Sequence, residues 1–354
     1  MSEPPGGADP RLPGSVAGAD RRPTLLEVAR RAGVSRATAS LVIRNASGPS
    51  ARSRELVTRA AAELGYRPDR NAQLLRRRES RLIGVMFRAQ DAFHADLIEN
   101  IYATSEGLGY EVVLSAVFPT RNEESAFEAL TASRCQAVIA IGVSETCNTD
   151  FGSHLPVVEI GRPPGETTFD AVFTDDEYGV HLAVDHLVSL GHRDIVHIDG
   201  GDAPGAAERR TGYLDAMAGH GLKRWTRVLA GDYTELSGAA AARQLLAGEQ
   251  LPTAVIAGND QCAVGVLDEL GRAGVDIPAD VSVVGYDDSR LARLAHVDLT
   301  TVRQDVEQLA RLAVEAAVGR IDDARDPKPP RAFRLPPHLV IRGSTGPVRR
   351  DAGC

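Results

Sequence analysis

The chain has 354 residues, of which 43% are hydrophobic and 25% charged, and its formal net charge is -8. A chain of this length is too long for one ordinary hydrophobic core, and the composition is that of a globular protein. We therefore predict two or three domains. No apolar run approaches the roughly 20 residues that a membrane span needs, and the first residues contain no apolar signal segment. We therefore expect a cytoplasmic protein without a membrane partner.

The four cysteines, Cys135, Cys147, Cys262 and Cys354, form no C-x-x-C pair and have no histidine cluster beside them. This spacing argues against a disulfide framework and against a zinc site. We predict reduced thiols, no metal and no cofactor.

Charge is distributed unevenly along the chain. Residues 21–81 hold 15 arginines against five acidic residues, a net charge of +10, and residues 1–20 sum to -2. The total of -8 leaves -16 for the remainder. A basic module on an acidic body is typical of a nucleic-acid-binding protein, although a solvated arginine-rich helical face would show the same charge.

The basic module begins with two short predicted helices. Thr24 and Glu27 form a T-x-x-E capping box that predicts a helix start, and Gly33 predicts its end. Ser35 is a suitable N-cap for the second helix, so "AGVS" is predicted to be the turn of a helix-turn-helix. The outward face of the second helix would then enter a major groove, and it carries Arg36, Ala37, Ser40, Leu41 and Arg44.

A third helix and a short hinge segment are expected next. Ser50 is the predicted cap of the third helix, which ends at Gly65, and Pro68 forbids its continuation. A hinge over residues 67–81 is too short to be stable alone as a helix, but it could form beside a polyanion.

From Arg81 onward, short β-rich apolar runs alternate with helices predicted near residues 95–108, 178–190, 207–220 and 261–273. Repeated strand–helix units predict two lobes built on parallel sheets. The loops after the strands are rich in Asp, Asn and Arg, at the strand ends where α/β sheets bind ligands. Such side chains, with aromatic rings among them, suit a polyhydroxylated ligand.

The ordered motifs "TLLEVARRAGVSRATASLVIRN", "ELGYRPDRNAQLLRRR" and "LIGV" resemble those of the LacI/GalR family of bacterial transcriptional regulators. The resemblance spans about residues 23–345. It implies an α + α/β fold: a three-helix helix-turn-helix domain with a hinge helix, then a two-lobed, type I periplasmic-binding-protein-like effector domain. The expected divisions are a tail at 1–22, the helix-turn-helix at 23–66, the hinge at 67–81, lobe 1 at about 82–190 plus 303–335, lobe 2 at about 191–302 plus 336–345, and a tail at 346–354.

The resemblance also implies a homodimer on a near-palindromic double-stranded operator, with Leu75 of each hinge helix wedged into the minor groove and Ala72 supporting it. Ordinary dimer packing is the alternative role for Leu75. The expected DNA-binding residues are Thr24, Ser35, Arg36, Ala37, Thr38, Ser40, Leu41, Arg44, Asn45, Tyr66, Arg70, Ala72, Leu75 and Arg76.

Two residues depart from the family pattern on the recognition helix. Leu41 stands where many members have an arginine that reads guanine, and Arg44 replaces a commoner asparagine. Leucine cannot donate to guanine, so we predict an operator unlike the usual half-site.

For the effector site, the resemblance implies Phe93, His94, Asp175, Arg209, Tyr233, Asn259, Asp260 and Asp287. Each has a structural alternative. Asn259 and Asp260 could cap the following helix, Arg209 could be a solvated helical residue, and His94, where many members have phenylalanine, could be a hydrogen-bonded core residue.

The leading hypothesis is a DNA-binding repressor whose operator affinity changes with a small-molecule effector, a sugar or sugar derivative. A purine or nucleoside is the alternative effector, because Tyr233 would stack on either. A periplasmic carrier is a second class, which the basic module disfavours. An enzyme is a third class, but no G-x-S-x-G, H-E-x-x-H or phosphate-loop motif is present. The enzyme that remains as an alternative is a glycosidase that uses two of the cleft acids as its carboxylate pair.

Overall fold

The computed structural model describes residues 23–66, 80–89, 91–142, 155–163, 169–323 and 328–349. The predicted DNA contacts Arg70, Ala72, Leu75 and Arg76 lie outside these residues, as do the predicted tail at 1–22, residues 67–79 of the predicted hinge at 67–81, and residues 350–354 of the predicted tail at 346–354. The chain divides into two compact units, residues 1–79 and 80–354. In the described ranges, no helix is both long and apolar enough to cross a membrane.

The first unit is a three-helix bundle made of α1 (Leu25–Ala32), α2 (Arg36–Ile43) and α3 (Ala51–Glu63). The Thr24–Glu27 capping box is present, and Gly33 ends α1 with φ +66°, a conformation that glycine adopts without strain. Ser35 and Ser50 accept N–H groups of the first turns of α2 and α3. The predicted helix-turn-helix is therefore confirmed, including the residues that cap its helices.

A small apolar core holds these three helices together. Its buried side chains are Val28, Ala29, Ala32, Ala39, Val42, Val57 and Ala60. Val34 of the turn packs against this core. Burying one face of α2 leaves its opposite face free to meet a partner.

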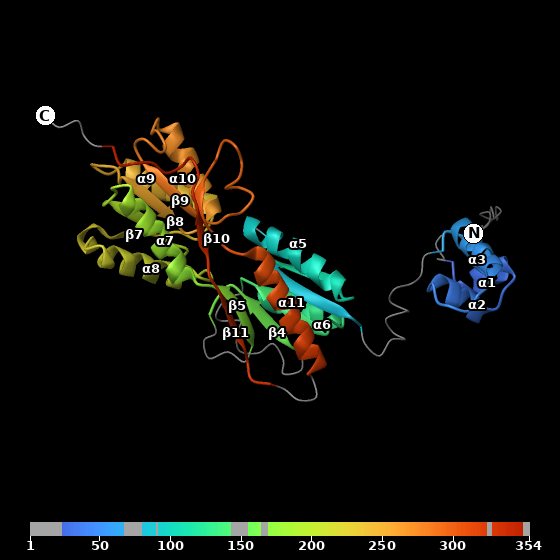
Figure 1. Cartoon of the computed structure of the whole chain (residues 1–354). Helices are drawn as coiled ribbons and strands as arrows, with labels where there is room; N and C mark the ends of the chain where they lie inside the picture. Colours follow the sequence, from blue (N-terminus) through green and yellow to red (C-terminus); the bar gives the residue numbers. More distant parts are fainter. Residues whose placement is uncertain are drawn as a thin grey trace, which may run out of the picture. The chain divides into compact units, whose positions relative to one another are not determined.

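The second unit contains two six-stranded sheets, one in each lobe (Figure 1). The first sheet has the order β11-β5-β4-β3-β1-β2, and all its pairs are parallel. Its strands are β1 (Leu82–Arg88), β2 (Glu111–Val117), β3 (Ala137–Ile141), β4 (Val157–Ile160), β5 (Asp170–Thr174) and β11 (Ala332–Leu335).

The second sheet has the order β12-β10-β9-β8-β6-β7, with β12 antiparallel to β10. Its strands are β6 (Ile195–Ile198), β7 (Arg227–Leu229), β8 (Ala254–Ala257), β9 (Ser282–Asp287), β10 (Thr300–Arg303) and β12 (His338–Val340). The central strands of both sheets are buried throughout, as expected where helices cover both faces.

Helices cover both sheets. α5 (Ala92–Gly107) and α11 (Val306–Asp322) pack on the first sheet through one apolar cluster, and α6 (Glu123–Ala132) packs against β1 and β2. On the second sheet, α9 (Glu235–Leu246) and α10 (Asp260–Arg272) share one cluster, while α7 (Asp176–Ser189) and α8 (Ala206–Gly219) share another. The predicted two-lobed α/β domain is therefore confirmed.

One predicted lobe boundary is wrong. Residues up to 190 were predicted to belong to lobe 1, whereas Val180, Val184 and Leu187 of α7 are buried with the strands of the second sheet. The chain therefore crosses to lobe 2 after β5, at Asp175. The helical pattern gave the position of α7 but not the sheet that its apolar face covers. The other crossings follow β10 and β11, close to the predicted residues 302 and 335.

Candidate functional site

A cavity of about 600 Å³ lies between the two lobes, and residues of both lobes line it. This volume is in the range of small-molecule sites. Its wall includes the carboxyl ends of β1, β3, β4 and β5 in lobe 1 and of β9 in lobe 2, together with the loops that follow β6 and β8. Of the eight predicted effector residues, six line it: Phe93, His94, Arg209, Tyr233, Asn259 and Asp287.

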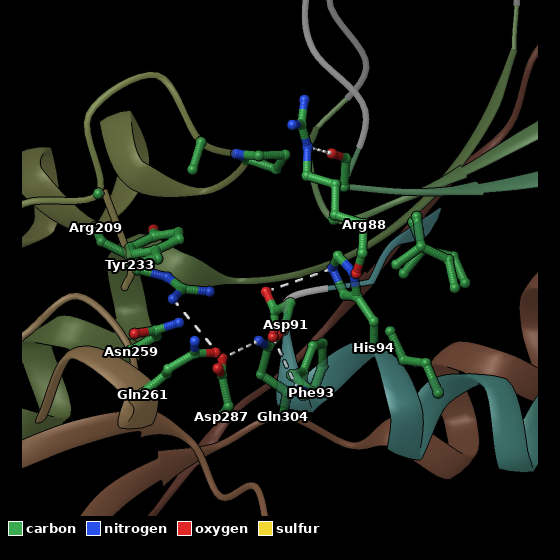
Figure 2. Close-up of a pocket in the computed structure, with 18 of the residues that line it drawn as sticks. Arg88, Asp91, Phe93, His94, Arg209, Tyr233, Asn259, Gln261, Asp287 and Gln304 are labelled. Atoms are coloured by element: carbon green, nitrogen blue, oxygen red, sulfur yellow. Dashed lines mark hydrogen bonds and ion pairs between the residues drawn. The ribbon is translucent and has the colours of Figure 1, made fainter. Parts of the chain in front are cut away.

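Arg209, on the first turn of α8, is the central cation of the lobe 2 wall (Figure 2). Its Nε donates to Asp176 Oδ1 at 2.9 Å and its Nη1 donates to the Gly258 carbonyl at 2.6 Å. Its guanidinium carbon lies 3.7 Å from the Tyr286 ring centroid. Burial disfavours the charged form, but Asp176 and its other neighbours outweigh burial and raise the pKa of Arg209 well above its usual range. This buried arginine is therefore permanently charged and fixed in position, and the solvated alternative is wrong.

Asp287, the last residue of β9, connects Arg209 to lobe 1. Its Oδ1 lies 3.8 Å from Arg209 Nη1 and accepts a hydrogen bond from Gln304 Nε2 at 2.7 Å, and Gln304 Oε1 in turn accepts one from Thr174 at 2.7 Å. Burial raises the pKa of Asp287 well above its usual range, although Arg209 opposes this. The backbone of Asp287 is held at φ +114°, a strained conformation for a non-glycine residue that is often found at functional sites.

Tyr233 presents an aromatic ring to the cavity from the loop before α9 (Figure 2). A Cβ atom on Gly200 would lie 2.1 Å from this ring, and one on Gly258 would lie 2.6 Å from it. The ring therefore occupies space that only glycine leaves open. Asn259 has two roles. Its Oδ1 accepts a hydrogen bond from the Cys262 N–H, which caps α10, and Asn259 also lines the cavity.

The start of α5 contributes to the lobe 1 wall (Figure 2). Asp91 caps this helix by accepting the Phe93 N–H at 2.9 Å, and its Oδ2 lies 3.6 Å from His94 Nε2. His94 Nδ1 lies 3.0 Å from the Arg88 carbonyl. His94 thus combines the two alternatives, since it is hydrogen-bonded in the protein and also faces the cavity.

Two predicted effector residues do not line the cavity. Asp175 caps α7 through the Tyr178 N–H and binds Arg334 at 2.5 Å. Asp260 is fully buried inside lobe 2, where it accepts hydrogen bonds from Thr301 Oγ1 at 2.5 Å and from the Ser289 N–H at 2.7 Å. Burial raises the pKa of Asp260 to about 7. Both carboxylates are occupied by structural partners, which corrects the prediction for them.

Several residues of the site are not among those that the sequence predicts. Arg88, Asp91, Thr174 and Gln304 line the cavity, and Asp176 positions Arg209. Asp91 had a readable signal, because it is a capping residue shortly after a buried strand. Gln304 had no such signal, because its place in the cavity depends on the chain passing from one lobe to the other after β10.

The recognition helix α2 exposes Arg36, Ala37 and Arg44, while Thr38, Ser40 and Leu41 are half-buried. Arg44 Nε donates to the Ser40 carbonyl at 3.1 Å, which holds the guanidinium along the helix. Neither arginine forms a described ion pair with an acidic residue. The face therefore carries two arginines that no described acidic residue neutralises, and their contact with DNA stays a prediction.

The remaining predicted DNA contacts of this unit have local partners. Thr38 Oγ1 lies 2.9 Å from Ser35 Oγ at the start of α2, and the Asn45 side-chain carbonyl accepts a hydrogen bond from Arg54 at 3.4 Å. Tyr66 packs against the core of the unit. Their contact with DNA stays a prediction.

A helix-turn-helix unit followed by a two-lobed domain with a ligand-sized cavity defines the class of ligand-responsive DNA-binding regulators. Comparison with known proteins agrees with this class. Residues 24–69 match the family of bacterial regulatory proteins described as the lacI family, and residues 184–345 match a periplasmic binding protein-like domain. The chain is 31% identical over 345 residues to the HTH-type transcriptional repressor PurR of Erwinia tasmaniensis, covering 92% of this chain and 98% of that protein.

Two solved structures are also similar. A LacI transcriptional regulator from a Rhodococcus species is 48% identical, covers 76% of this chain and 100% of its own, and has a TM-score of 0.73. A lac repressor dimer bound to operator and the anti-inducer ONPF is 30% identical, covers 92% of this chain and 100% of its own, and has a TM-score of 0.77. The chain belongs to the lacI family of bacterial regulatory proteins and is a DNA-binding transcriptional regulator.

Proposed function

We propose that this regulator binds a near-palindromic operator as a homodimer, and that a sugar or sugar derivative in the interlobe cavity sets its operator affinity. The observation that carries this proposal is the cavity itself, whose polar groups come from both lobes. A ligand that contacts both lobes binds the closed form better than an open one, and so shifts the population toward closure.

The chemistry of the wall supports a polyhydroxylated ligand. Asp91, Asp287 and Asn259 offer acceptors and an amide donor, Arg209 offers a fixed cation, and Tyr233 offers a ring face. Carboxylates and amides bind adjacent hydroxyls, and an aromatic ring packs on the apolar face of a sugar.

A purine or nucleoside is the second candidate. Its support is that Phe93 of lobe 1 and Tyr233 of lobe 2 both line the cavity, so a planar base could contact an aromatic side chain in each lobe. Binding of nucleosides in preference to saccharides would favour this candidate.

Exposed apolar residues support the homodimer. Leu236 on α9 is 80% exposed, and Leu114 and Phe118, on and just after the edge strand β2, are also exposed. Large apolar side chains that a single chain leaves exposed at a sheet edge are candidates for contact with a second copy. We therefore propose that two copies of the chain form the operator-binding unit.

The experiment that tests the DNA-binding part is selection of bound sequences from random duplex DNA by the purified full chain. We expect a palindrome with a flexible pyrimidine–purine step at its centre, because such steps kink most easily around a wedged leucine. The selected operator then serves to screen saccharides and nucleosides for release or tightening. Failure to enrich any sequence at low salt would contradict sequence-specific binding by the chain alone.

A further inference from the structure

The last described residues of the chain, 345–349, form a segment that we call the C-terminal strap. The strap follows Ser344, which is buried in lobe 2. Ser344 Oγ donates to the Val283 carbonyl at 2.6 Å and accepts the Thr300 N–H at 2.8 Å, so it is bonded to both β9 and β10. The chain is therefore anchored in lobe 2 up to Ser344.

Fewer bonds hold the strap itself. It has no regular secondary structure. Its Gly346 N–H donates to Ser282 Oγ at 3.1 Å, and its Val348 N–H donates to the Leu190 carbonyl at 3.1 Å. A Cβ atom on Gly191 would lie 2.9 Å from Val348 Cγ1, so the strap packs directly on the turn that follows α7. A segment held this lightly can open locally while the rest of the lobe stays folded.

Two histidines lie against the strap. His186 Nε2, near the end of α7, is 3.0 Å from Thr345 Oγ1, and His192 Nε2 is 2.9 Å from the Gly346 carbonyl. A carbonyl only accepts, so His192 donates from Nε2. The other nitrogen of this ring, Nδ1, is buried and has no hydrogen-bond partner among the described residues. A second proton on His192 would therefore be a buried N–H group without an acceptor, which is unfavourable.

The surroundings of the two rings oppose positive charge. Burial lowers the pKa of His192, although its hydrogen bond to the Gly346 carbonyl acts in the other direction. Burial and repulsion from His192 lower the pKa of His186. Among the described residues, no carboxylate is bonded to either ring. The acidic side chains of the neighbouring elements have other partners, which are His220 for Asp185, Arg227 for Asp194, Arg349 for Asp280 and the Gly343 N–H for Asp298, while Arg193 and Arg342 in the same region are positive.

We propose that the C-terminal strap is a pH-sensitive device that leaves lobe 2 in mild acid, when His192 and His186 take up protons, while the chain up to Ser344 stays in place. Release lets water reach the His192 ring, so the released form binds a proton more readily than the docked form. Docking is therefore fully stabilised above about pH 6.5 and is lost as the pH falls below this value. Each histidine should favour release by up to about ten-fold between about pH 7.5 and 5.5.

Hydrogen exchange of the full chain, followed by mass spectrometry and corrected for the intrinsic exchange rate, tests this proposal at about pH 7.5 and 5.5. We expect the amides of the strap to lose protection by roughly ten-fold or more at the lower pH. The strands β8 and β9 should keep their protection. Equal loss in β8 and β9 would mean that lobe 2 unfolds as a whole, and unchanged protection of the strap would mean that it stays docked. Either result would overturn the proposal.

Two variants assign the effect to the histidines. Glutamine can still donate a hydrogen bond but takes up no proton in this range, so His192→Gln should keep the bond to Gly346 and lose most of the pH dependence. His186→Gln should reduce the pH dependence as well. The matched control is His220→Gln, because His220 pairs with Asp185 and has no described bond to the strap. This control should behave like the parent protein. Full pH dependence in both strap variants would contradict a role for the histidine pair.

Discussion

Arg290 of lobe 2 forms an ion pair with Asp96 of α5 in lobe 1, with Arg290 Nε 2.6 Å from Asp96 Oδ1. Arg290 also binds Glu99, one turn further along the same helix. The arginine follows β9, which ends at the cavity residue Asp287, while α5 carries Phe93 and His94. A salt bridge between the lobes thus lies close to the ligand-binding residues on both sides.

We predict that Arg290→Glu shifts the lobes toward an open arrangement, because it replaces an attraction across the cleft with repulsion. Distances between spin labels on the two lobes should lengthen, and effector binding should weaken roughly a few-fold, since exposed ion pairs contribute little each. Arg290→Asp combined with Asp96→Arg should restore part of the loss. The control is Arg311→Ala, because Arg311 pairs with Glu315 within α11. An unchanged distance distribution would exclude a role in closure.

Two glycines of α10 should respond oppositely to the same substitution. A Cβ atom on Gly265 would lie 2.0 Å from the Glu235 carbonyl, where α9 packs on α10, whereas nothing lies within 4 Å of one on Gly271. Gly265→Ala should therefore destabilise the fold by about 1–3 kcal/mol. Gly271→Ala should stabilise it by up to about 1 kcal/mol through helix propensity. Denaturant unfolding of both variants measures the difference, and equal effects would contradict the close helix contact.

Local signals predicted much of this fold because they depend on neighbouring residues. The caps at Thr24, Ser35 and Ser50 and the buried strands were readable for that reason. The lobe that α7 joins was not readable, because an apolar stripe does not identify its partner sheet. The same limit explains the site: Asp175 faces Arg334, while its neighbour Asp176 faces Arg209. These two aspartates are adjacent in the sequence, and only the packing of the fold decides which of them holds the arginine of the cavity.

Asp287→Asn should abolish much of the effector response and leave operator binding nearly intact. Asparagine is tolerated in left-handed conformations and can still accept the hydrogen bond from Gln304, so the fold should persist. The acidic group beside Arg209 is replaced by an amide, and we expect effector affinity to fall roughly 10- to 100-fold. Calorimetry with the effector and gel-shift titration with the operator separate the two activities. Equal losses in both would indicate misfolding or a wrong site assignment.

Leu41→Arg should change the operator rather than simply tighten binding. Leu41 is half-buried on the recognition helix and cannot donate to guanine. An arginine there supplies a bidentate donor, which discriminates by about 1–3 kcal/mol against other bases. Repeating the sequence selection with the variant should show a guanine required at one half-site position where the parent protein requires none. If both proteins select the same sequence, position 41 does not contact a base.

His197 should make the effector domain sensitive to mild acid. It is buried on β6 beside Tyr213, and burial lowers its pKa from 6.5 to about 4. Because the unfolded chain binds this proton more readily than the folded one, stability is retained above about pH 6.5 and lost as pH falls toward 4. The loss at about pH 5 should be about 2 kcal/mol. His197→Phe keeps an aromatic ring and removes the titration, so its unfolding free energy should fall less between about pH 7 and 5 than that of the parent protein. Parallel pH profiles for the two proteins would show that the pKa of His197 does not change on folding, which would contradict the prediction.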